Sequence, residues 1–258
     1  MKIAYELNPP KIIKGERFDL AQLNKDMQVM VDRALQLSGL VSGIHLTDSV
    51  LGMPRVSSIT AATYIMKNAS MDDKVSMSCS IRVRDRNFTS LCQAVSDAVM
   101  AGVDSLLILM GDEPATGHGD SGLRPSAALM MLKKEGYDSG IKLDLSFPAK
   151  LTNRESASIR NKIGAKPHSL VTQSISSLSD LGEIVDLTRP HGIKVAAVVM
   201  VPSEKNRHSA SIIGLDWSGY EKEPADFVRQ AAKIADRVLL TSPNNFGSGV
   251  ELLKQLNA

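Results

Sequence analysis

The chain has 258 residues, 43% of them hydrophobic, which is enough to bury one large core in a single domain. Lys and Arg number 30 against 28 Asp and Glu, and the net charge of +2 argues against nucleic acid or an acidic membrane surface as a partner. Cys79 and Cys92 lack metal-ligand spacing, and no signal peptide or apolar span of ~20 residues occurs, so we expect a cytoplasmic protein.

Short apolar runs alternate along the chain with segments of helical period, a pattern typical of a parallel sheet with crossover helices. The expected strands are 2–7, 43–48, 74–82, 105–111, 142–148, 169–175, 194–201 and 237–242. The expected helices are 18–38, 57–69, 88–102, 124–136, 154–164, 178–189, 223–236 and 248–256. Helix 88–102 has the clearest ends, because Asn87 is a candidate N-cap and Gly102 a candidate stop.

Eight strand–helix units without a break in composition predict a single (β/α)8 TIM barrel over residues 1–258. Strands 105–111 and 194–201 are almost continuously apolar, as in a sheet covered on both faces. A doubly wound open sheet with one extra unit would give a similar string. The segment 203–222 follows the seventh strand, so we expect a loop or short helix over the mouth of the barrel.

Polar residues cluster where the expected strands end, which is where a barrel gathers its reactive groups. The strand ends read Glu6-Leu7-Asn8-Pro9-Pro10, Leu46-Thr47-Asp48-Ser49, Ser80-Ile81-Arg82-Val83-Arg84-Asp85, Met110-Gly111-Asp112-Glu113-Pro114 and Val171-Thr172-Gln173. The sequence therefore predicts one cavity that collects carboxylates from three strands, a glutamine and basic groups.

Two carboxylates are the main candidates for chemistry. Glu6 lies in an apolar strand, where loss of solvent would raise its pKa toward that of a general acid; alternatively it pairs with an arginine or a backbone amide. Asp112 follows Gly111, which lets a ligand approach the backbone; alternatively Asp112 caps local amides.

Three other patterns leave their alternatives open or argue against a site. Arg82, Arg84 and Arg86 either hold phosphate or carboxylate groups or form a solvated basic loop. Segment 117–122 matches G-x-G-x-x-G but begins some six residues after its strand, so we favour a flexible loop over a dinucleotide site. The five histidines show no metal-binding spacing, and His45 is expected to be a packed polar residue.

Five motifs together point to a known family. Glu6-Leu7-Asn8-Pro9-Pro10, Thr47-Asp48 with Gly52 and Arg55, Arg84-Asp85-Arg86-Asn87, Leu109-Met110-Gly111-Asp112-Glu113-Pro114 and Val171-Thr172-Gln173 follow one another over roughly residues 1–202. In order and spacing they resemble the methylenetetrahydrofolate reductase family.

The resemblance implies a (β/α)8 barrel that binds FAD and passes a hydride from a reduced nicotinamide, through the flavin, to methylenetetrahydrofolate. It implies that Glu6 is the general acid, that Asp112 lies between flavin and pterin and tunes charge, and that Gln173 contacts the folate. The implied cofactor contacts are Thr47, Asp48, Ser80, Arg82, Gly111, Asp112, Phe147 and Lys162.

The chain departs from the family pattern at two positions. Ser80 stands where the family commonly has a flavin-contacting histidine, and Met110 where it commonly has an arginine. These departures leave open an altered or absent FAD site, another hydride donor and another tetrahydropterin. They also leave open a second hypothesis, in which the chain is a folate- or pterin-binding, subunit-like protein without independent redox activity. Under either hypothesis the protein could form a homo-oligomer or bind a partner subunit.

Overall fold

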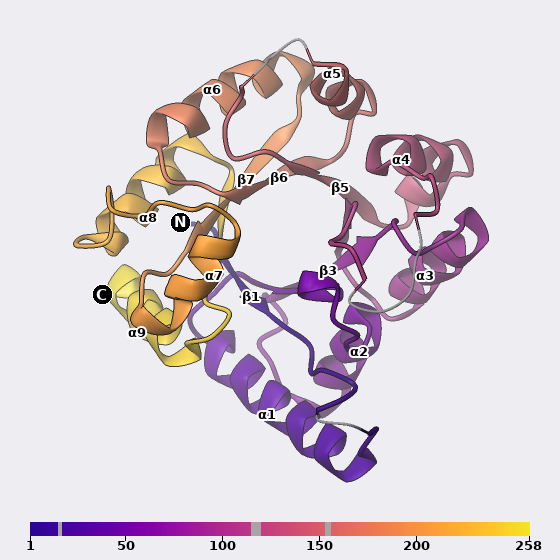
Figure 1. The fold of residues 1–258 in the computed structure, drawn as a ribbon, viewed down its shortest axis with the longest axis horizontal. Coiled ribbons are helices and arrows are strands. Elements are labelled where there is room, and N and C mark those ends of the chain that lie inside the picture. The colour runs from indigo at the N-terminus through magenta and orange to yellow at the C-terminus, as the bar shows by residue number, and fades with distance from the viewer. Residues whose placement is uncertain (15–16, 115–119, 153–155) are drawn as a thin grey trace.

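The chain folds as a closed barrel of eight parallel strands in the order β1 to β8 (Figure 1). The computed structural model describes residues 1–14, 17–114, 120–152 and 156–258. The strands are β1 (Ile3–Leu7), β2 (Gly43–Leu46), β3 (Ser76–Arg82), β4 (Ser105–Leu109), β5 (Lys142–Phe147), β6 (Ser169–Ser174), β7 (Lys194–Met200) and β8 (Arg237–Thr241). Strand β1 pairs with both β2 and β8, so the sheet has no free edge and the open-sheet alternative is wrong.

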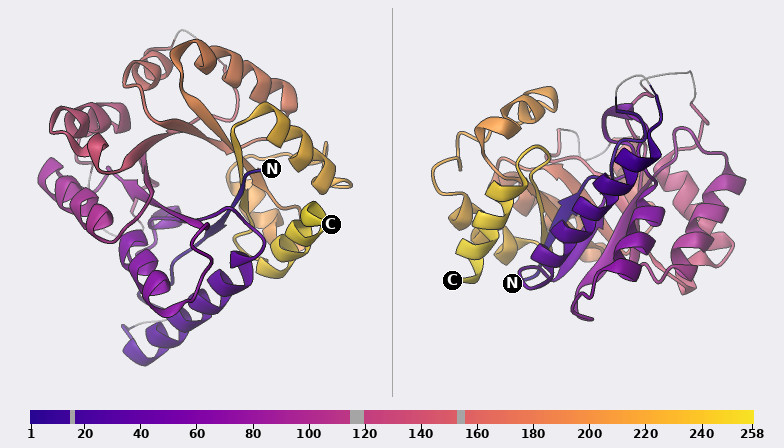
Figure 2. Two further views of the ribbon diagram at one scale, coloured as in Figure 1. Left: turned by 180° about the vertical axis from the view of Figure 1, so that it is seen from behind. Right: turned by 90° about the horizontal axis from the view of Figure 1, so that it is seen from below.

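Helices surround the barrel on its outside, as both views in Figure 2 show. They are α1 (Leu20–Ser38), α2 (Ser58–Asn68), α3 (Phe88–Met100), α4 (Pro125–Lys134), α5 (Ala157–Gly164), α6 (Leu178–Thr188), α7 (Arg207–Ile212), α8 (Pro224–Ile234) and α9 (Phe246–Asn257). Short 3-10 turns η1 (Val50–Gly52), η2 (Tyr137–Ser139), η3 (Arg189–His191) and η4 (Glu204–Asn206) join them. The eight predicted strand–helix units are confirmed, and α7 is additional.

Side-chain caps begin several of these helices. Asn87 Oδ1 accepts from Ser90 N at 2.8 Å and so caps α3, as the sequence predicts. Gly102 follows α3 with φ of +77°, a conformation that glycine adopts without a steric cost. The ends of α3 are therefore set by local sequence as well as by packing.

Two apolar regions stabilise the fold. The larger lies between the barrel and its helices, and the smaller fills the inside of the barrel with Ala4, Leu107, Val171, Ala196, Val198 and Leu239. The interior also holds a buried polar layer. Asp144 accepts from Ser169 Oγ at 2.7 Å and pairs with Arg237 at 3.3 Å, and His45 is 3% exposed between two serines. His45 is thus a packed polar residue, as expected.

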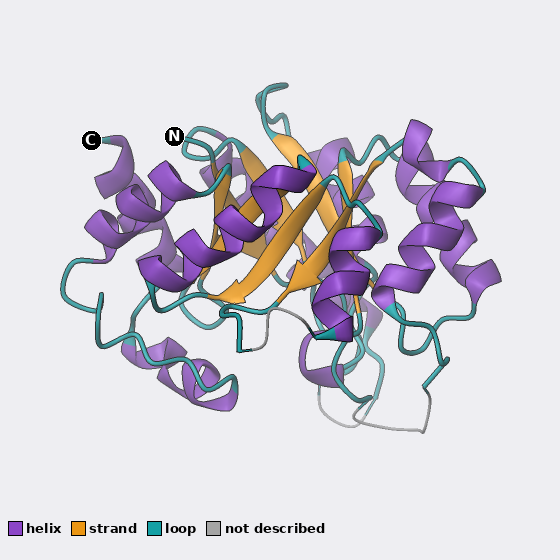
Figure 3. Cartoon of the chain, turned by 90° about the horizontal axis from the view of Figure 1, so that it is seen from above, coloured by secondary structure: helices purple, strands orange, loops and turns teal. Residues whose placement is uncertain are grey.

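The two ends of the barrel differ. Figure 3 shows the strand arrowheads pointing to the side on which α7 lies, whereas both termini lie on the opposite side. Turn η4 and helix α7 follow β7, so the expected short helix of segment 203–222 is confirmed at the mouth. Within the described ranges, no helix is long and apolar enough to span a bilayer.

Candidate active site

A cavity of about 1290 Å³ opens at the carboxyl ends of the strands. It brings together seven of the predicted site residues: Glu6, Thr47, Asp48, Ser80, Gly111, Asp112 and Gln173. Three others, Arg82, Phe147 and Lys162, lie outside its lining. Side chains from strands distant in sequence meet here because all parallel strands end at the same face of the barrel.

Glu6 points from β1 into this cavity. Its Oε1 accepts a 2.7 Å hydrogen bond from Thr241 Oγ1 on the neighbouring strand β8, and no cation pairs with it among the described residues. Burial raises the pKa of the Glu6 carboxyl, and the hydrogen bond from Thr241 offsets only part of that rise. The structure therefore favours the general-acid interpretation of Glu6 over an ion pair with arginine.

Thr47 and Asp48 follow β2 and line the cavity beside Glu6. Thr47 Oγ1 donates to Asn8 Oδ1 at 2.7 Å, which ties the ends of β1 and β2 together. Asp48 is buried and accepts from Arg82 N at 3.2 Å and from Arg86 Nη2 at 3.1 Å. Asp48 thus neutralises Arg86 and has little charge left for a ligand.

Asp112 lies exposed on the rim of the cavity, after β4. Its Oδ2 accepts a 2.8 Å hydrogen bond from Leu51 N, whose own φ of +58° is left-handed. Gly111 before it has φ of +83°, and a Cβ there would collide with Arg82. The carboxylate therefore holds a strained turn of the β2–α2 loop at the rim of the cavity.

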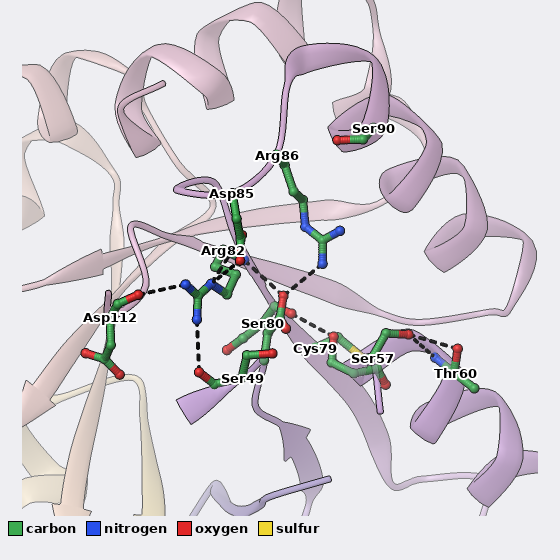
Figure 4. A network of polar contacts seen from close by, with 12 residues as sticks. Ser49, Ser57, Thr60, Cys79, Ser80, Arg82, Asp85, Arg86, Ser90 and Asp112 are labelled. Carbon is green, nitrogen blue, oxygen red and sulfur yellow. Dashed lines mark hydrogen bonds and ion pairs between the residues drawn. The ribbon is translucent and has the colours of Figure 1, made fainter. Parts of the chain in front are cut away.

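Arg82 differs from the expectation that it contacts a cofactor. It is 2% exposed, and its guanidinium donates to Asp112 O at 2.7 Å, Ser49 O at 3.0 Å and Asp85 Oδ1 at 3.2 Å (Figure 4). Each nitrogen already donates to a protein oxygen. The side chain braces three loops behind the cavity because a planar guanidinium can bind several oxygens at fixed angles.

Arg84 and Arg86 also donate hydrogen bonds to groups of the neighbouring loops, each through one guanidinium nitrogen. Arg84 Nε donates to Gly111 O at 3.1 Å, and Arg86 Nη2 pairs with Asp48. The three arginines therefore form neither a solvated basic loop nor an open anion site; they connect the loops that follow β2, β3 and β4.

A side cavity of about 300 Å³ adjoins the main one, and Gln173 lines both. Phe147 and Lys162 lie here. Lys162 Nζ donates to Ser146 O at 2.7 Å and lies 5.9 Å from the Phe147 ring centroid, and burial lowers the pKa of its ammonium group. Gln173 is exposed, and its carboxamide makes no hydrogen bond to the described residues.

Sequence reasoning overlooked a basic corner of the cavity. Lys11 and Arg55 pair as an isolated antiparallel bridge between the β1–α1 and β2–α2 loops, and Arg55 Nη1 donates to Pro9 O at 2.6 Å. The Arg55 Nε is buried without a partner among the described residues, and burial lowers the pKa of the guanidinium. No periodicity marks such loop pairing, although the Pro9-Pro10 pair does show where β1 must stop.

Two further expectations concern metals and the glycine motif. No cluster of three or more histidine, cysteine, aspartate or glutamate side chains suited to a metal ion occurs in the part of the chain that the structure describes. Of the G-x-G-x-x-G segment 117–122, residues 117–119 lie outside the described residues, which omit 115–119.

No protein-family model matches the chain, and no curated protein matches it in sequence. Among solved structures, the aldolase QR15 shares 12% sequence identity with it at a TM-score of 0.54, covering 100% of this chain and 94% of the other. A chain of the tryptophan synthase α2β2 complex from Pyrococcus furiosus shares 13% identity at a TM-score of 0.53, covering 99% and 94%. At these identities the likeness shows the (β/α)8 barrel fold alone.

Proposed function

We propose that the protein is a cytoplasmic reductase of the methylenetetrahydrofolate reductase type. Its substrate is a methylene-tetrahydrofolate or a related tetrahydropterin, and its product is the methyl form. The observation that carries the proposal is the Glu6 carboxyl, which lies in the cavity without an ion-pair partner among the described residues and has a raised pKa. A carboxyl whose pKa is raised holds its proton more readily than a solvated one and can give it to a substrate nitrogen.

The residues of the cavity fit a flavin. Interior side chains Leu107, Leu109, Val171, Val198 and Leu239 offer an apolar floor for one face of a flat ring system. Thr47, Asp48, Ser80 and Gly111 lie around that floor, and Lys162 in the side cavity carries a cation suited to a phosphate. When bound, FAD supplies the hydride that it has taken from a reduced nicotinamide or another donor.

The chain's own residues then have distinct tasks. Protonated Glu6 donates its proton to the bridging amine nitrogen, the C–N bond breaks with its electron pair going to that nitrogen, and the hydride is added to the iminium carbon. The Asp112 carboxylate at the rim stabilises the positive charge on that carbon. Gln173, with a free carboxamide among the described residues, contacts the pterin through its donor and acceptor atoms.

The visible absorbance of the purified protein tests the cofactor, and Glu6→Gln tests the chemistry. We expect flavin bands, and a 10²- to 10⁴-fold loss of methylene reduction in Glu6→Gln with ligand binding retained, since general acid catalysis contributes roughly that much. Glu251→Gln on α9, where the side chain is 66% exposed, is the matched control and should keep full activity. A fully active Glu6→Gln enzyme contradicts the assigned role.

A second candidate is a tetrahydropterin-binding subunit without independent redox activity. Two observations favour it: Ser80 and Met110 replace residues that commonly contact flavin in the family, and each nitrogen of the Arg82 guanidinium already donates to a protein oxygen. This candidate predicts a colourless protein that binds methyltetrahydrofolate in calorimetry yet shows no turnover with reduced nicotinamide, flavin or deazaflavin.

A further inference from the structure

The floor of the cavity is backed by an imidazole held between two serines. His45 on β2 places Nε2 2.8 Å from Ser80 Oγ and Nδ1 2.9 Å from Ser78 Oγ, both on β3. Ser80 lines the cavity, whereas Ser78 lies two residues deeper in the barrel and outside the cavity lining. The three side chains are buried, so their hydrogen bonds have no competition from bulk water.

The imidazole is neutral in this environment. Burial, with Arg237 nearby, lowers the pKa of His45 to about 3. A neutral imidazole has one N–H donor and one bare acceptor nitrogen, so only two arrangements of the serine–histidine–serine chain exist.

One arrangement satisfies every proton in the chain. Ser80 Oγ–H donates to Nε2, Nδ1–H donates to Ser78 Oγ, and Ser78 Oγ–H donates to Ile44 O at 3.4 Å. In the reverse arrangement Nε2–H donates to Ser80, and the Ser80 proton then has no acceptor among the described residues. The first arrangement gives every proton a protein acceptor, whereas the reverse turns the Ser80 proton into the cavity, so the protein's own hydrogen bonds favour the first arrangement.

We propose that His45 is a positioning residue that fixes the Ser80 hydroxyl with its proton turned away from the cavity, which makes Ser80 an acceptor that selects a ligand N–H or O–H. This inference deepens the proposed function, on which its ligand part rests, because isoalloxazine and pterin rings and the ribityl chain of FAD all carry such donors. A ligand carbonyl or phosphate oxygen at this point would face the Ser80 lone pairs and be rejected.

Two-bond ¹H–¹⁵N spectra of the full chain labelled with ¹⁵N-histidine at pH 7 test the proposal, and loss of one signal set in His45→Gln identifies His45. We expect a protonated Nδ1 and a bare Nε2, in the free protein and with FAD or 5-methyltetrahydrofolate added at saturation. A protonated Nε2 in the free protein, or a switch to it on binding, overturns the proposal. If neither probe binds, the proposed function fails, while the tautomer of the free protein still decides the orientation of Ser80.

Serine variants separate positioning from simple structural support. Ser78→Ala removes the acceptor of Nδ1–H without touching the cavity, so we expect His45 to shift toward the Nε2–H tautomer and FAD to bind about fivefold more weakly, equivalent to one neutral hydrogen bond. Ser58→Ala is the matched control, because Ser58 is equally buried and donates to the backbone oxygen of Ser80 without contacting His45. It should keep both the tautomer and the FAD affinity. An unshifted Ser78→Ala variant, or an equal shift in Ser58→Ala, contradicts the assigned role.

Discussion

The buried His45 makes the protein sensitive to acid in a defined pH window. In the unfolded chain its pKa is the ordinary 6.5, whereas in the folded protein burial lowers it to about 3. Between these values the unfolded chain binds a proton that the folded protein does not. The stability from this histidine is therefore fully present above pH 6.5 and is lost progressively as the pH falls toward 3.

The size of the effect follows from the width of that window. Each pH unit below 6.5 lowers the free energy of unfolding by about 1.4 kcal/mol, so two units, down to pH 4.5, lower it by roughly 2.7 kcal/mol. Urea unfolding followed by circular dichroism at pH 7 and pH 4.5 measures this loss. In His45→Gln, which keeps one donor and one acceptor between the serines, the loss should be smaller by that amount.

Comparison of wild type with the variant removes the contributions of all other titrating groups. His191→Gln, at an exposed position in η3, is the control and should keep the wild-type pH dependence. If His45→Gln loses as much stability between pH 7 and pH 4.5 as wild type, then the imidazole is not held neutral by burial and the reasoning is refuted.

Three further predictions concern stability. Gly249→Ala should lower the free energy of unfolding by about 1–3 kcal/mol, because the added methyl would overlap the Tyr5 ring and hydroxyl. The control Gly182→Ala on α6, with open space around it, should be neutral or stabilising. Equal urea midpoints for the two variants would contradict the steric argument. Arg82→Lys should lower the free energy of unfolding by about 3 kcal/mol in the same urea assay, because an ammonium cannot reproduce the three directed hydrogen bonds. A wild-type urea midpoint would show that the brace is dispensable. Glu6→Gln should be more stable than wild type at pH 8 and no more stable near pH 4. The reason is that a carboxyl whose pKa is raised in the folded protein makes folding less favourable as the pH rises above its pKa in the unfolded chain. If the difference in unfolding free energy between variant and wild type is the same at both pH values, the Glu6 pKa is not raised.

The fold could be predicted from the sequence because apolar periodicity and the polar residues at strand ends are local signals. The same rule placed Glu6, Asp112 and Gln173 in one cavity, since parallel strands must end at a common face. Strand alternation also explains Phe147: Ser146 lines the main cavity, so the next side chain packs toward the helices.

The missed features depend on which loops touch. Arg82 was expected to face a cofactor, but its guanidinium donates to the backbone oxygens of Ser49 and Asp112. These residues lie 33 and 30 positions away from it in the chain. The pairing of Lys11 with Arg55 likewise joins two loops whose spacing gives no sign of contact. Propensity and spacing describe neighbours along the chain, whereas these contacts arise only after the barrel has closed.

Hydrogen bonds connect the loops on one side of the cavity entrance, whereas the residues described on the other side lie outside that network. Loops after β2, β3 and β4 share hydrogen bonds through Arg82, Arg84 and Asp112, so a substitution in one of them is transmitted to the others. Across the opening, Gln173 is tied to no such network among the described residues, and Ile213 after α7 is about half exposed. New ligand preferences should therefore be obtained at lower cost in stability from changes after β6 and β7 than from changes opposite them.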